Sequence, residues 1–217
     1  MKRILGIALG TVALAVGLGL YVGIYLTAAP GSARATTTGS GTHLYLATVP
    51  SAALTDAHPT WVSYYAVNAD GTHWRHDTTY VLPAHTLVHV TIYQYDSATG
   101  LRNPYLAGAE GTSGGSFQND GKTTRGINPN LASHVFAVPQ LGLNVPLAGV
   151  ADNAKNPCSN APCTLKQAHV TVTFSFRTGG PGLLRWQCFV PCGAGFIAGW
   201  GGPMQTVGYM DGYLKVV

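Results

Sequence analysis

Charged side chains are scarce in this sequence. Of its 217 residues, 12 are Lys or Arg and 8 are Asp or Glu, which amounts to 9% of the chain, against roughly 25% in an average soluble domain. Three of the basic residues, Lys2, Arg3 and Arg34, flank an apolar segment, so the remainder is close to neutral. A surface that neutralises many phosphates needs clustered Lys and Arg. The sequence therefore predicts no nucleic-acid partner.

Several catalytic motifs are also absent. The sequence contains no Gly-rich phosphate loop that opens a helix, no HExxH and no Gly-x-Ser-x-Gly. Its 8 acidic residues are scattered singly, so the sequence alone places no two carboxylates together. We expect that the chain is not an enzyme by itself, and that in an oxidoreductase complex it would be a non-catalytic subunit.

The N-terminal segment is the longest apolar run. No charged side chain occurs between Ile4 and Ala29, which exceeds the roughly 20 residues that span a bilayer. Lys2 and Arg3 precede the run and favour a cytoplasmic N-terminus. We therefore expect residues 1–29 to anchor the chain in the cell membrane by a single pass, with the rest on the extracytoplasmic side.

A cleaved signal peptide is the alternative for this segment. Ala33-Arg34-Ala35 has the small-x-small form of a cleavage site. Both interpretations place the remaining chain outside the cytoplasm. Residues 30–42 are small and polar, which predicts a flexible tether.

Residues 43–217 are predicted to form one all-β domain. Val88, Val90 and Ile92 alternate with polar residues, and so do the apolar residues of 170–176, as in strands that bury one face. Segment 96–133 is rich in Gly, Ser, Asn and Thr and is predicted to be a long loop insertion. Short strands punctuated by Pro, Gly and Asn indicate a β-sandwich, with further strands expected near 44–49, 61–67, 78–82, 135–138, 183–188 and 212–217.

The four cysteines form two close pairs. Cys158 and Cys163 lie among Asn, Pro and Ser, without a His or acidic neighbour. In an oxidising compartment this pair is expected to form a local disulfide rather than a metal site.

The second pair, Cys188 and Cys192, has a different setting. Cys188 ends a predicted strand on its buried side, and Met204 and Met210 follow. Thiolate, thioether and imidazole are the soft ligands that select copper, and a His/Cys site with a distant Met transfers electrons. Met204 and Met210 are alternatives for the axial ligand.

Three stretches of this sequence resemble the cupredoxin superfamily. The segment that begins Ser133-His134-Val135-Phe136 resembles the strand that supplies the first histidine ligand, and the segment 181–188 resembles the strand that ends in the cysteine ligand. Segment 210–216 resembles the axial methionine and the closing strand, and Val81 to Ile92 resembles an early strand. The resemblance covers roughly residues 60–217. It implies a cupredoxin-like Greek-key β-sandwich that binds copper through His134, Cys188 and Met210.

The Cys188-x3-Cys192 spacing is similar to the CuA loop of cytochrome oxidase subunit II, a family that also tethers its outer domain by membrane helices. The CuA loop continues with a histidine and a methionine, where this sequence has Phe196 and Gly199. No histidine occurs after His169. The resemblance therefore leaves the ligand set incomplete.

Three completions of the site remain open. Cys192 can replace the second histidine, giving a His134/Cys188/Cys192/Met210 copper site. Cys188 and Cys192 can instead form a disulfide in a metal-free fold. A histidine from elsewhere can also complete the site. The candidates are His169, His85, His89 and a histidine of a partner chain.

Two functions follow from these completions. The first is a membrane-anchored, extracytoplasmic cupredoxin-like protein that binds copper and transfers single electrons, or delivers copper, within a membrane redox complex. The second is a metal-free structural or assembly subunit of a membrane oxidase or copper monooxygenase complex, with a Cys188–Cys192 disulfide. The nearly neutral domain offers little electrostatic steering, which favours a fixed place in a larger complex.

The remaining histidines are expected to be structural. His85 and His89 are predicted to share the partly exposed face of one strand, opposite Val88 and Val90. His73 and His76 lack a third donor, so a metal ion would bind weakly there. We expect His73 and His76 to be loop residues.

Overall fold

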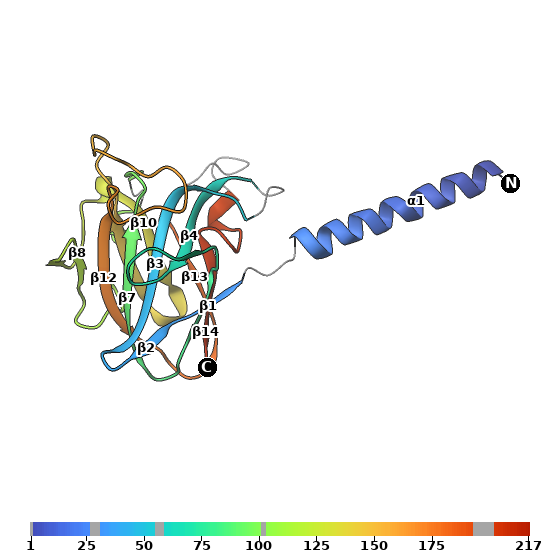
Figure 1. Cartoon of the computed structure of the whole chain (residues 1–217). Coiled ribbons are helices and arrows are strands. Elements are labelled where there is room, and N and C mark those ends of the chain that lie inside the picture. Colours follow the sequence, from blue (N-terminus) through green and yellow to red (C-terminus); the bar gives the residue numbers. More distant parts are fainter. Residues whose placement is uncertain (1, 27–30, 55–58, 101–102, 193–201) are drawn as a thin grey trace.

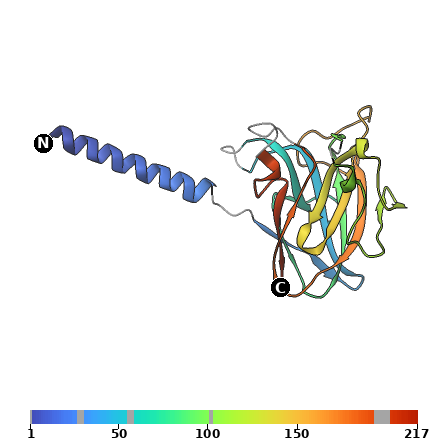
Figure 2. The same ribbon diagram turned by 180° about the vertical axis from the view of Figure 1, so that it is seen from behind.

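An N-terminal helix precedes two β-sheets that face each other across an apolar core (Figures 1 and 2). The computed structural model describes residues 2–26, 31–54, 59–100, 103–192 and 202–217. The predicted all-β sandwich with one N-terminal helix is the fold observed. Strands that begin at Gly41 and Leu87 are parallel neighbours. They are joined by a crossover connection, because a hairpin joins only antiparallel strands.

Helix α1 (Lys2–Leu20) continues into the π-helical segment η1 (Tyr21–Leu26). Figure 1 shows that α1 extends away from the sandwich. The window Gly6–Gly23 is long and apolar enough to cross a membrane, and none of it is buried. A helix with these properties can serve as a membrane anchor or as a signal sequence.

The first sheet has six strands in the order β1-β6-β14-β13-β10-β11. Strand β6 runs parallel to both of its neighbours, and the other pairings are antiparallel. Its strands are β1 (Ser32–Arg34), β6 (Thr79–Leu82), β10 (Ala132–Val138), β11 (Leu143–Ala148), β13 (Gly182–Gln187) and β14 (Asp211–Val216).

The second sheet has eight strands in the order β5-β4-β3-β7-β12-β8-β9, and β2 pairs with β3 off this path. Its strands are β2 (Thr36–Thr38), β3 (Gly41–Ala52), β4 (Trp61–Val67), β5 (Trp74–Arg75), β7 (Leu87–Gln94), β8 (Phe117–Asn119), β9 (Lys122–Thr124) and β12 (Val170–Arg177). Short 3-10 helices occur at η2 (Pro104–Ala107), η3 (Pro129–Leu131), η4 (Pro139–Leu141) and η5 (Gly202–Met204).

Alternation of side chains builds the core between the sheets. Val88, Val90 and Ile92 of β7 are buried, whereas the residues between them face outward. Aromatic rings join the two sheets, since Tyr64 of β4 lies edge-on to Trp186 of β13 with ring centroids 4.8 Å apart. Both rings are fully buried. The cysteine-bearing strand is thus fixed to the opposite sheet close to the predicted metal site.

Residues 32–34 and 36–38, predicted to belong to a flexible tether, form the strands β1 and β2 instead. Strand β1 pairs with β6, and β2 pairs with β3. Ala33 and Ala35 are buried in the core. Small side chains are typical of flexible segments. Here they also allow the edge of the sheet to pack against the core. The pairing of this segment depends on partners that local composition does not report.

The segment 96–133, predicted as a loop insertion, contains the β8–β9 hairpin, which extends the second sheet beyond β12. It also covers the edge strand β11, because Glu110 and Asn144 exchange backbone hydrogen bonds. The Asn144 side chain donates to the carbonyl oxygens of Leu106 and Gly108. Every residue of the neighbouring inner strand β10 is buried, including His134.

Candidate metal centre

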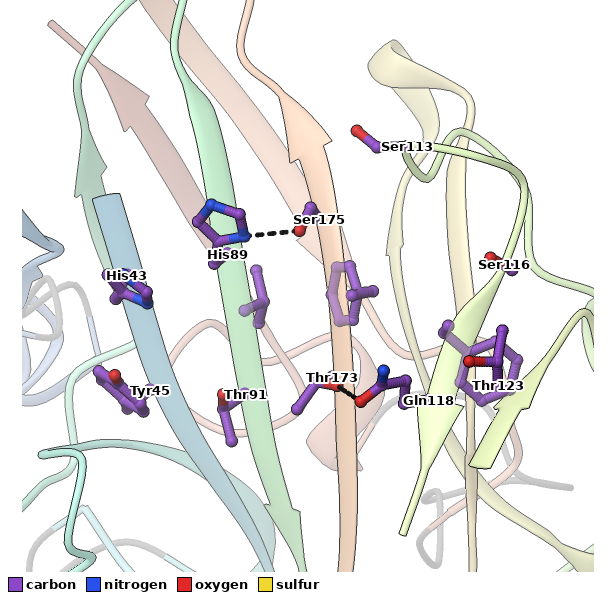
Figure 3. A pocket seen from close by; sticks show the side chains of 13 residues that line it. His43, Tyr45, His89, Thr91, Ser113, Ser116, Gln118, Thr123, Thr173 and Ser175 are labelled. Carbon is purple, nitrogen blue, oxygen red and sulfur yellow. Dashed lines mark hydrogen bonds between the residues drawn. The ribbon is translucent and has the colours of Figure 1, made fainter. Parts of the chain in front are cut away.

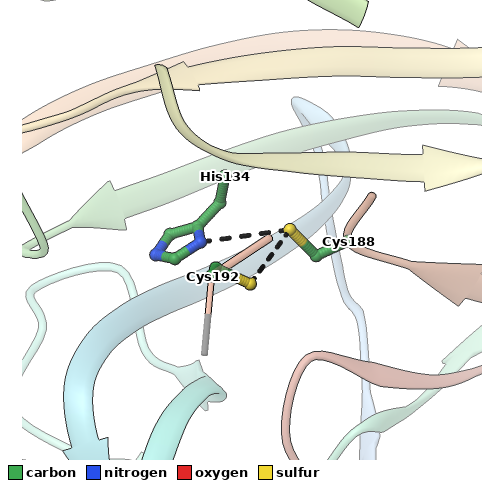
Figure 4. Close-up of side chains that lie close together, drawn as sticks. All are labelled: His134, Cys188 and Cys192. Carbon is green, nitrogen blue, oxygen red and sulfur yellow. Dashed lines mark hydrogen bonds between the residues drawn. The ribbon is translucent and has the colours of Figure 1, made fainter. Parts of the chain in front are cut away.

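Three predicted ligands converge at one end of the sandwich. His134 lies on β10, and Cys188 follows the last residue of the adjacent strand β13. Cys192 lies on the segment that leaves this strand. His134 and Cys188 are fully buried, and Cys192 is 6% exposed. Figure 4 shows the imidazole and the two sulfur atoms turned toward one another.

The distances between the three side chains are short. Cys188 Sγ lies 3.9 Å from His134 Nδ1 and 3.5 Å from Cys192 Sγ. All three potential ligand atoms lie within 4.8 Å of one another. Among the residues that the structure describes, this is the one group of three or more His, Cys, Asp or Glu side chains with such spacing.

A β-bulge positions the histidine. The register between β10 and β11 shifts between Ala132 and His134. A bulge inserts one extra residue and can redirect a side chain next to a functional site. Here His134 and Val135 are both fully buried. The irregular register therefore accompanies the placement of the imidazole beside Cys188.

Backbone hydrogen bonds hold the cysteine in place. The Val135 N–H donates to Cys188 Sγ at 3.5 Å, and the Cys188 N–H donates to the Met210 carbonyl oxygen at 2.9 Å. Strand β10 and the segment that precedes β14 thus fix Cys188 from two sides. A donor directed at sulfur stabilises the thiolate form.

A carboxylate supports the imidazole from its other side. His134 Nε2 lies 3.1 Å from Asp96 Oδ2, and the Asp96 side chain is 15% exposed. With Nε2 bonded to a carboxylate, Nδ1 is the ring nitrogen that faces the sulfur atoms. Metal-binding histidines commonly donate their other N–H to a carboxylate in this way.

The electrostatics of the cluster favour a thiolate on Cys188. Burial opposes this charge, but hydrogen bonds from Cys192 and His134 outweigh burial and hold the pKa of Cys188 well below its usual range. Burial likewise opposes the imidazolium, but the hydrogen bonds with Asp96 and Cys188 raise the pKa of His134 to about 9. The hydrogen bond to Cys188, together with burial, raises the pKa of Cys192.

The donor set fits a small soft metal ion. Metal–sulfur bonds of about 2.3 Å and metal–imidazole bonds of about 2.0–2.1 Å place ligands of a three- or four-coordinate ion roughly 3.5–4 Å apart. The Cys188–Cys192 and Cys188–His134 separations fall in this range. Two cysteines and one imidazole are soft or borderline ligands, which suit copper or zinc better than calcium or magnesium.

The two methionines differ in their position relative to Cys188. Met210 is fully buried in the main core, and its carbonyl oxygen bonds the Cys188 N–H. Met204 is partly buried, and its carbonyl oxygen accepts a hydrogen bond from the Gln187 amide. The backbone of Met210 is therefore adjacent to the cluster. Its role as a fourth ligand stays a prediction.

The other predicted site residues lie elsewhere. Cys158 and Cys163 form the expected local disulfide, which pins the loop before β12. Cys188 and Cys192 are free thiols. Phe196 and Gly199, which differ from the CuA pattern, lie outside the described residues.

The remaining histidines do not reach the cluster. His85 was predicted to share a strand face with His89, but β7 begins at Leu87, and His85 lies in the preceding turn with φ of 52°. His89 is on the outer face of the second sheet, where it bonds Ser175. His169 packs against Tyr93 and Tyr95. None of these three supplies a second imidazole in this structure.

Asp96 is the residue that sequence analysis missed. It lies just beyond the end of β7, at the start of a segment interpreted as a loop. One signal was available, because a buried histidine needs a partner for its second ring nitrogen. The sequence did not say which of the scattered acidic residues supplies that partner.

No protein-family model matches this sequence, and no curated protein matches it. Several solved structures are similar in fold to this chain. A structure of reduced rusticyanin shares 14% identity over 86% of this chain and 84% of its own, with a TM-score of 0.35. Rusticyanin from Thiobacillus ferrooxidans gives 15% identity, coverage of 86% and 82%, and a TM-score of 0.31. Auracyanin B gives 16% identity, coverage of 87% and 98%, and a TM-score of 0.27.

These are distant likenesses of fold. At such identities and TM-scores they say nothing about the ligands of this chain. Rusticyanin is a copper protein. The case for a metal here is made by the side chains themselves.

Proposed function

We propose that this chain is a membrane-anchored, extracytoplasmic copper protein that transfers single electrons. The observation that carries the proposal is the buried cluster of His134, Cys188 and Cys192, with Asp96 behind the imidazole. Copper, when bound, supplies a one-electron couple. The protein supplies ligands that are already gathered, so little rearrangement accompanies a change of charge at the site.

Each residue has a role in this proposal. His134 Nδ1 and the two sulfur atoms are the ligands, and Met210 is the proposed axial ligand. Asp96 holds the imidazole and fixes which nitrogen faces the site. The Val135 N–H bonds the Cys188 sulfur and tunes its electron density. Binding of a cation would displace the protons held by His134 Nδ1 and the Cys192 thiol.

Cys192 takes the place that a second histidine has in the cupredoxin pattern. Its sulfur lies 3.5 Å from Cys188 Sγ, so both thiols can contact one ion. A dinuclear CuA site would require further ligands, and the sequence has Phe196 and Gly199 at the corresponding positions. These facts favour a mononuclear site with an unusual His/Cys/Cys set.

Burial favours retention of the metal over copper delivery. His134 and Cys188 are fully buried, and Cys192 is nearly so. A protein that passes copper to a partner needs ligands that the partner's ligands can reach. Electron transfer needs only a short distance between the centres, so a buried and rigid site is compatible with it.

The proposed location and partner follow from the N-terminal helix and the charge content. The window Gly6–Gly23 has no buried residue and is long and apolar enough to span a membrane. The β domain that follows the helix is nearly neutral and offers little long-range electrostatic attraction to a diffusing partner. We therefore place the chain in a larger membrane redox complex. Mass spectrometry of the mature protein tests retention of the anchor, since a cleaved signal peptide would remove it.

A metal-free subunit is the second candidate. The observation that favours it is the short separation of the two sulfur atoms, because oxidation of two adjacent thiols would close a Cys188–Cys192 disulfide. Such a disulfide would remove both sulfur ligands from the proposed site. The two candidates therefore make opposite predictions about free thiols.

Thiol counting and copper loading distinguish them. The full chain in detergent should release two reactive thiols on denaturation without reductant. After anaerobic loading with Cu(I) and oxidation by ferricyanide, it should show an intense visible thiolate-to-copper band and a Cu(II) paramagnetic signal. Cys188→Ser should abolish the band, and the Cys158→Ser/Cys163→Ser control should keep it. Zero free thiols, or no band in a chain with two, would contradict the copper proposal.

A further inference from the structure

A second potential binding site lies on the outer face of the second sheet, away from the metal centre. A groove of about 500 Å³ crosses β3, β7, β12 and the β8–β9 hairpin (Figure 3). This volume falls in the range of small-molecule sites. The metal centre involves β10 and β13 of the other sheet, so the groove is separate from it.

The groove is lined by side chains in two rows that follow the strand register. In one row, His43 of β3 lies opposite His89 of β7, which lies opposite Ser175 of β12. In the other row, Tyr45 lies opposite Thr91. This row continues across Thr173 of β12 and Gln118 of β8, and it ends at Thr123 of β9. Successive side chains in a row are therefore about 4.8 Å apart, the spacing between strands.

The chemistry of the lining is polar but without formal charge. The outward-facing side chains are hydroxyl, amide, phenol and imidazole groups, and none of the lining residues is Asp, Glu, Lys or Arg. A phosphorylated or sulfated ligand would call for Lys or Arg. A cationic ligand would call for carboxylates. The lining thus suits an uncharged ligand that has many hydrogen-bonding groups.

Several of these groups have hydrogen-bonding capacity to spare. Thr173 Oγ1 donates to Gln118 Oε1 at 3.2 Å, which leaves the Gln118 amide donors available. The hydroxyls of Tyr45, Thr91 and Thr123 make no hydrogen bond to another described residue. Such groups are satisfied by water when the groove is empty, and a ligand rich in hydroxyls can replace that water.

Aromatic rings form one end of the groove. The His43 ring stacks between Tyr45, at a centroid distance of 6.0 Å, and His89, at 5.2 Å. Hydrogen bonds hold the two imidazoles, His43 to Ser40 and His89 to Ser175. A rigid stack of rings beside hydroxyl rows offers an apolar surface next to polar groups, which matches the mixed surface of a sugar ring.

The site extends beyond this groove. A second hollow of about 450 Å³ shares His43 and Tyr45 with the first. Its other lining is rich in hydroxyl and amide groups, from Thr36, Thr38, Ser40 and Asn68, and also includes Ala69 and Asp70. The Asp70 carboxylate already accepts hydrogen bonds from the Thr72 N–H and hydroxyl. Two adjoining hollows that share a ring stack are better suited to a chain of several units than to one small molecule.

From these observations we infer that the outer face of the second sheet binds a neutral oligosaccharide chain along the groove marked by Tyr45, Thr91 and Thr173. The binding is non-covalent and independent of copper. A membrane-tethered domain with such a site would be held against a neutral polysaccharide. This inference does not rest on the proposed electron transfer, because the groove and the metal centre share no residue.

Titration calorimetry on the full chain in nanodiscs tests the inference, since detergents with sugar headgroups would compete. The probes are uncharged hexasaccharides of α-1,4-glucose, β-1,4-glucose, β-1,4-N-acetylglucosamine and α-1,6-mannose. At least one should bind. The Tyr45→Phe/Thr91→Val variant should bind it about tenfold more weakly, as expected for two lost hydrogen bonds. The control Thr79→Val, on β6 of the other sheet, should bind as the parent does.

Three outcomes would overturn the inference. The first is that none of the four hexasaccharides binds. The second is that the Tyr45→Phe/Thr91→Val variant binds as tightly as the control. The third is that a sulfated hexasaccharide, or Zn²⁺ held by His43 and His89, binds in the groove and the neutral probes do not. The copper band is measured in each variant, and it should be unchanged whichever result the sugar titration gives.

Discussion

The Asp96 carboxylate lies 3.1 Å from His134 Nε2, although Asp96 follows a strand of the second sheet and His134 is on a strand of the first. Asp96 follows β7, and His134 is on β10. This contact joins the two layers of the sandwich at the metal centre. It also fixes the orientation of the imidazole before any metal binds.

Asp96→Asn should therefore weaken copper binding. The amide can still accept the hydrogen bond, but it lacks the charge that supports the imidazole, and loss of such a partner typically costs about 10–100-fold in metal affinity. Competition with a chelator of known affinity measures the change. Asp152→Asn, which replaces a nearby exposed carboxylate, is the control and should bind as the parent does. Equal copper affinities of the Asp96→Asn and Asp152→Asn variants would show that Asp96 does not support metal binding.

Replacement of the methionines should separate the two candidates for the axial ligand. If Met210 is the ligand, Met210→Leu removes a weak sulfur donor that stabilises Cu(II), so the reduction potential should rise. Met204→Leu, which alters a partly buried side chain, should leave the potential near that of the parent. Voltammetry of the copper-loaded chain measures both. A rise confined to Met204→Leu would reverse the assignment.

Gly212 is required for the packing of β14. An added Cβ would lie 2.0 Å from the Thr78 carbonyl oxygen and 2.7 Å from Trp186 Nε1. That carbonyl accepts hydrogen bonds from Trp186 Nε1 and the Tyr213 N–H. Gly212→Ala should lower the free energy of unfolding by about 3 kcal/mol, at the upper end of the cost of overpacking a core.

Gly182→Ala is the matched control for this change. It lies at the start of β13, and an added Cβ would meet no atom within 4 Å. Urea unfolding of both variants gives the comparison. A Gly212→Ala chain as stable as Gly182→Ala would mean that β14 and Thr78 are not in close contact.

The partly buried His76 predicts a pH dependence of stability. Burial lowers the pKa of His76 from its ordinary value of 6.5. The unfolded chain therefore takes up this proton at a higher pH than the folded chain does. The stability contributed by neutral His76 is present above about pH 6.5, and it is lost as the pH falls through the lower folded-state value.

His76→Gln should flatten this dependence. The thermal midpoint of the parent should fall more steeply than that of the variant between about pH 7.5 and about pH 5. The variant loses stacking on Tyr65 at every pH, so the slope is the readout rather than the midpoint itself. His73→Gln, in the exposed turn before β5, should keep the slope of the parent. Parallel slopes for the parent and His76→Gln would contradict the prediction.

Much of the fold could be predicted from local patterns. The period-two alternation around Val88–Ile92 and 170–176 corresponds to β7 and β12, because a strand that buries one face must alternate. The short separation of Cys158 and Cys163 made a local disulfide reasonable. The run after Lys2 predicted helix α1. These features depend on neighbours in sequence, which the sequence shows directly.

Other elements could not be predicted in this way. Strands β1 and β2 form from residues whose composition suggests a tether, because their partners in β6 and β3 lie elsewhere in the chain. His85 leaves the strand pattern of His89 because the turn before β7 places it at positive φ. Pairing and turn geometry are set by tertiary contacts that override local preference.

The sequence by itself determined the order of His134, Cys188, Cys192 and Met210, and the types of ligand available to a metal. Only the tertiary structure brought His134 and Cys188 together, since 54 residues separate them, and it alone showed Asp96, 38 residues from His134, as the partner of the imidazole. The periodicity of a strand says which face a side chain takes. Which strands are neighbours, and which residues stand opposite one another, depends on how the two sheets pack over one core.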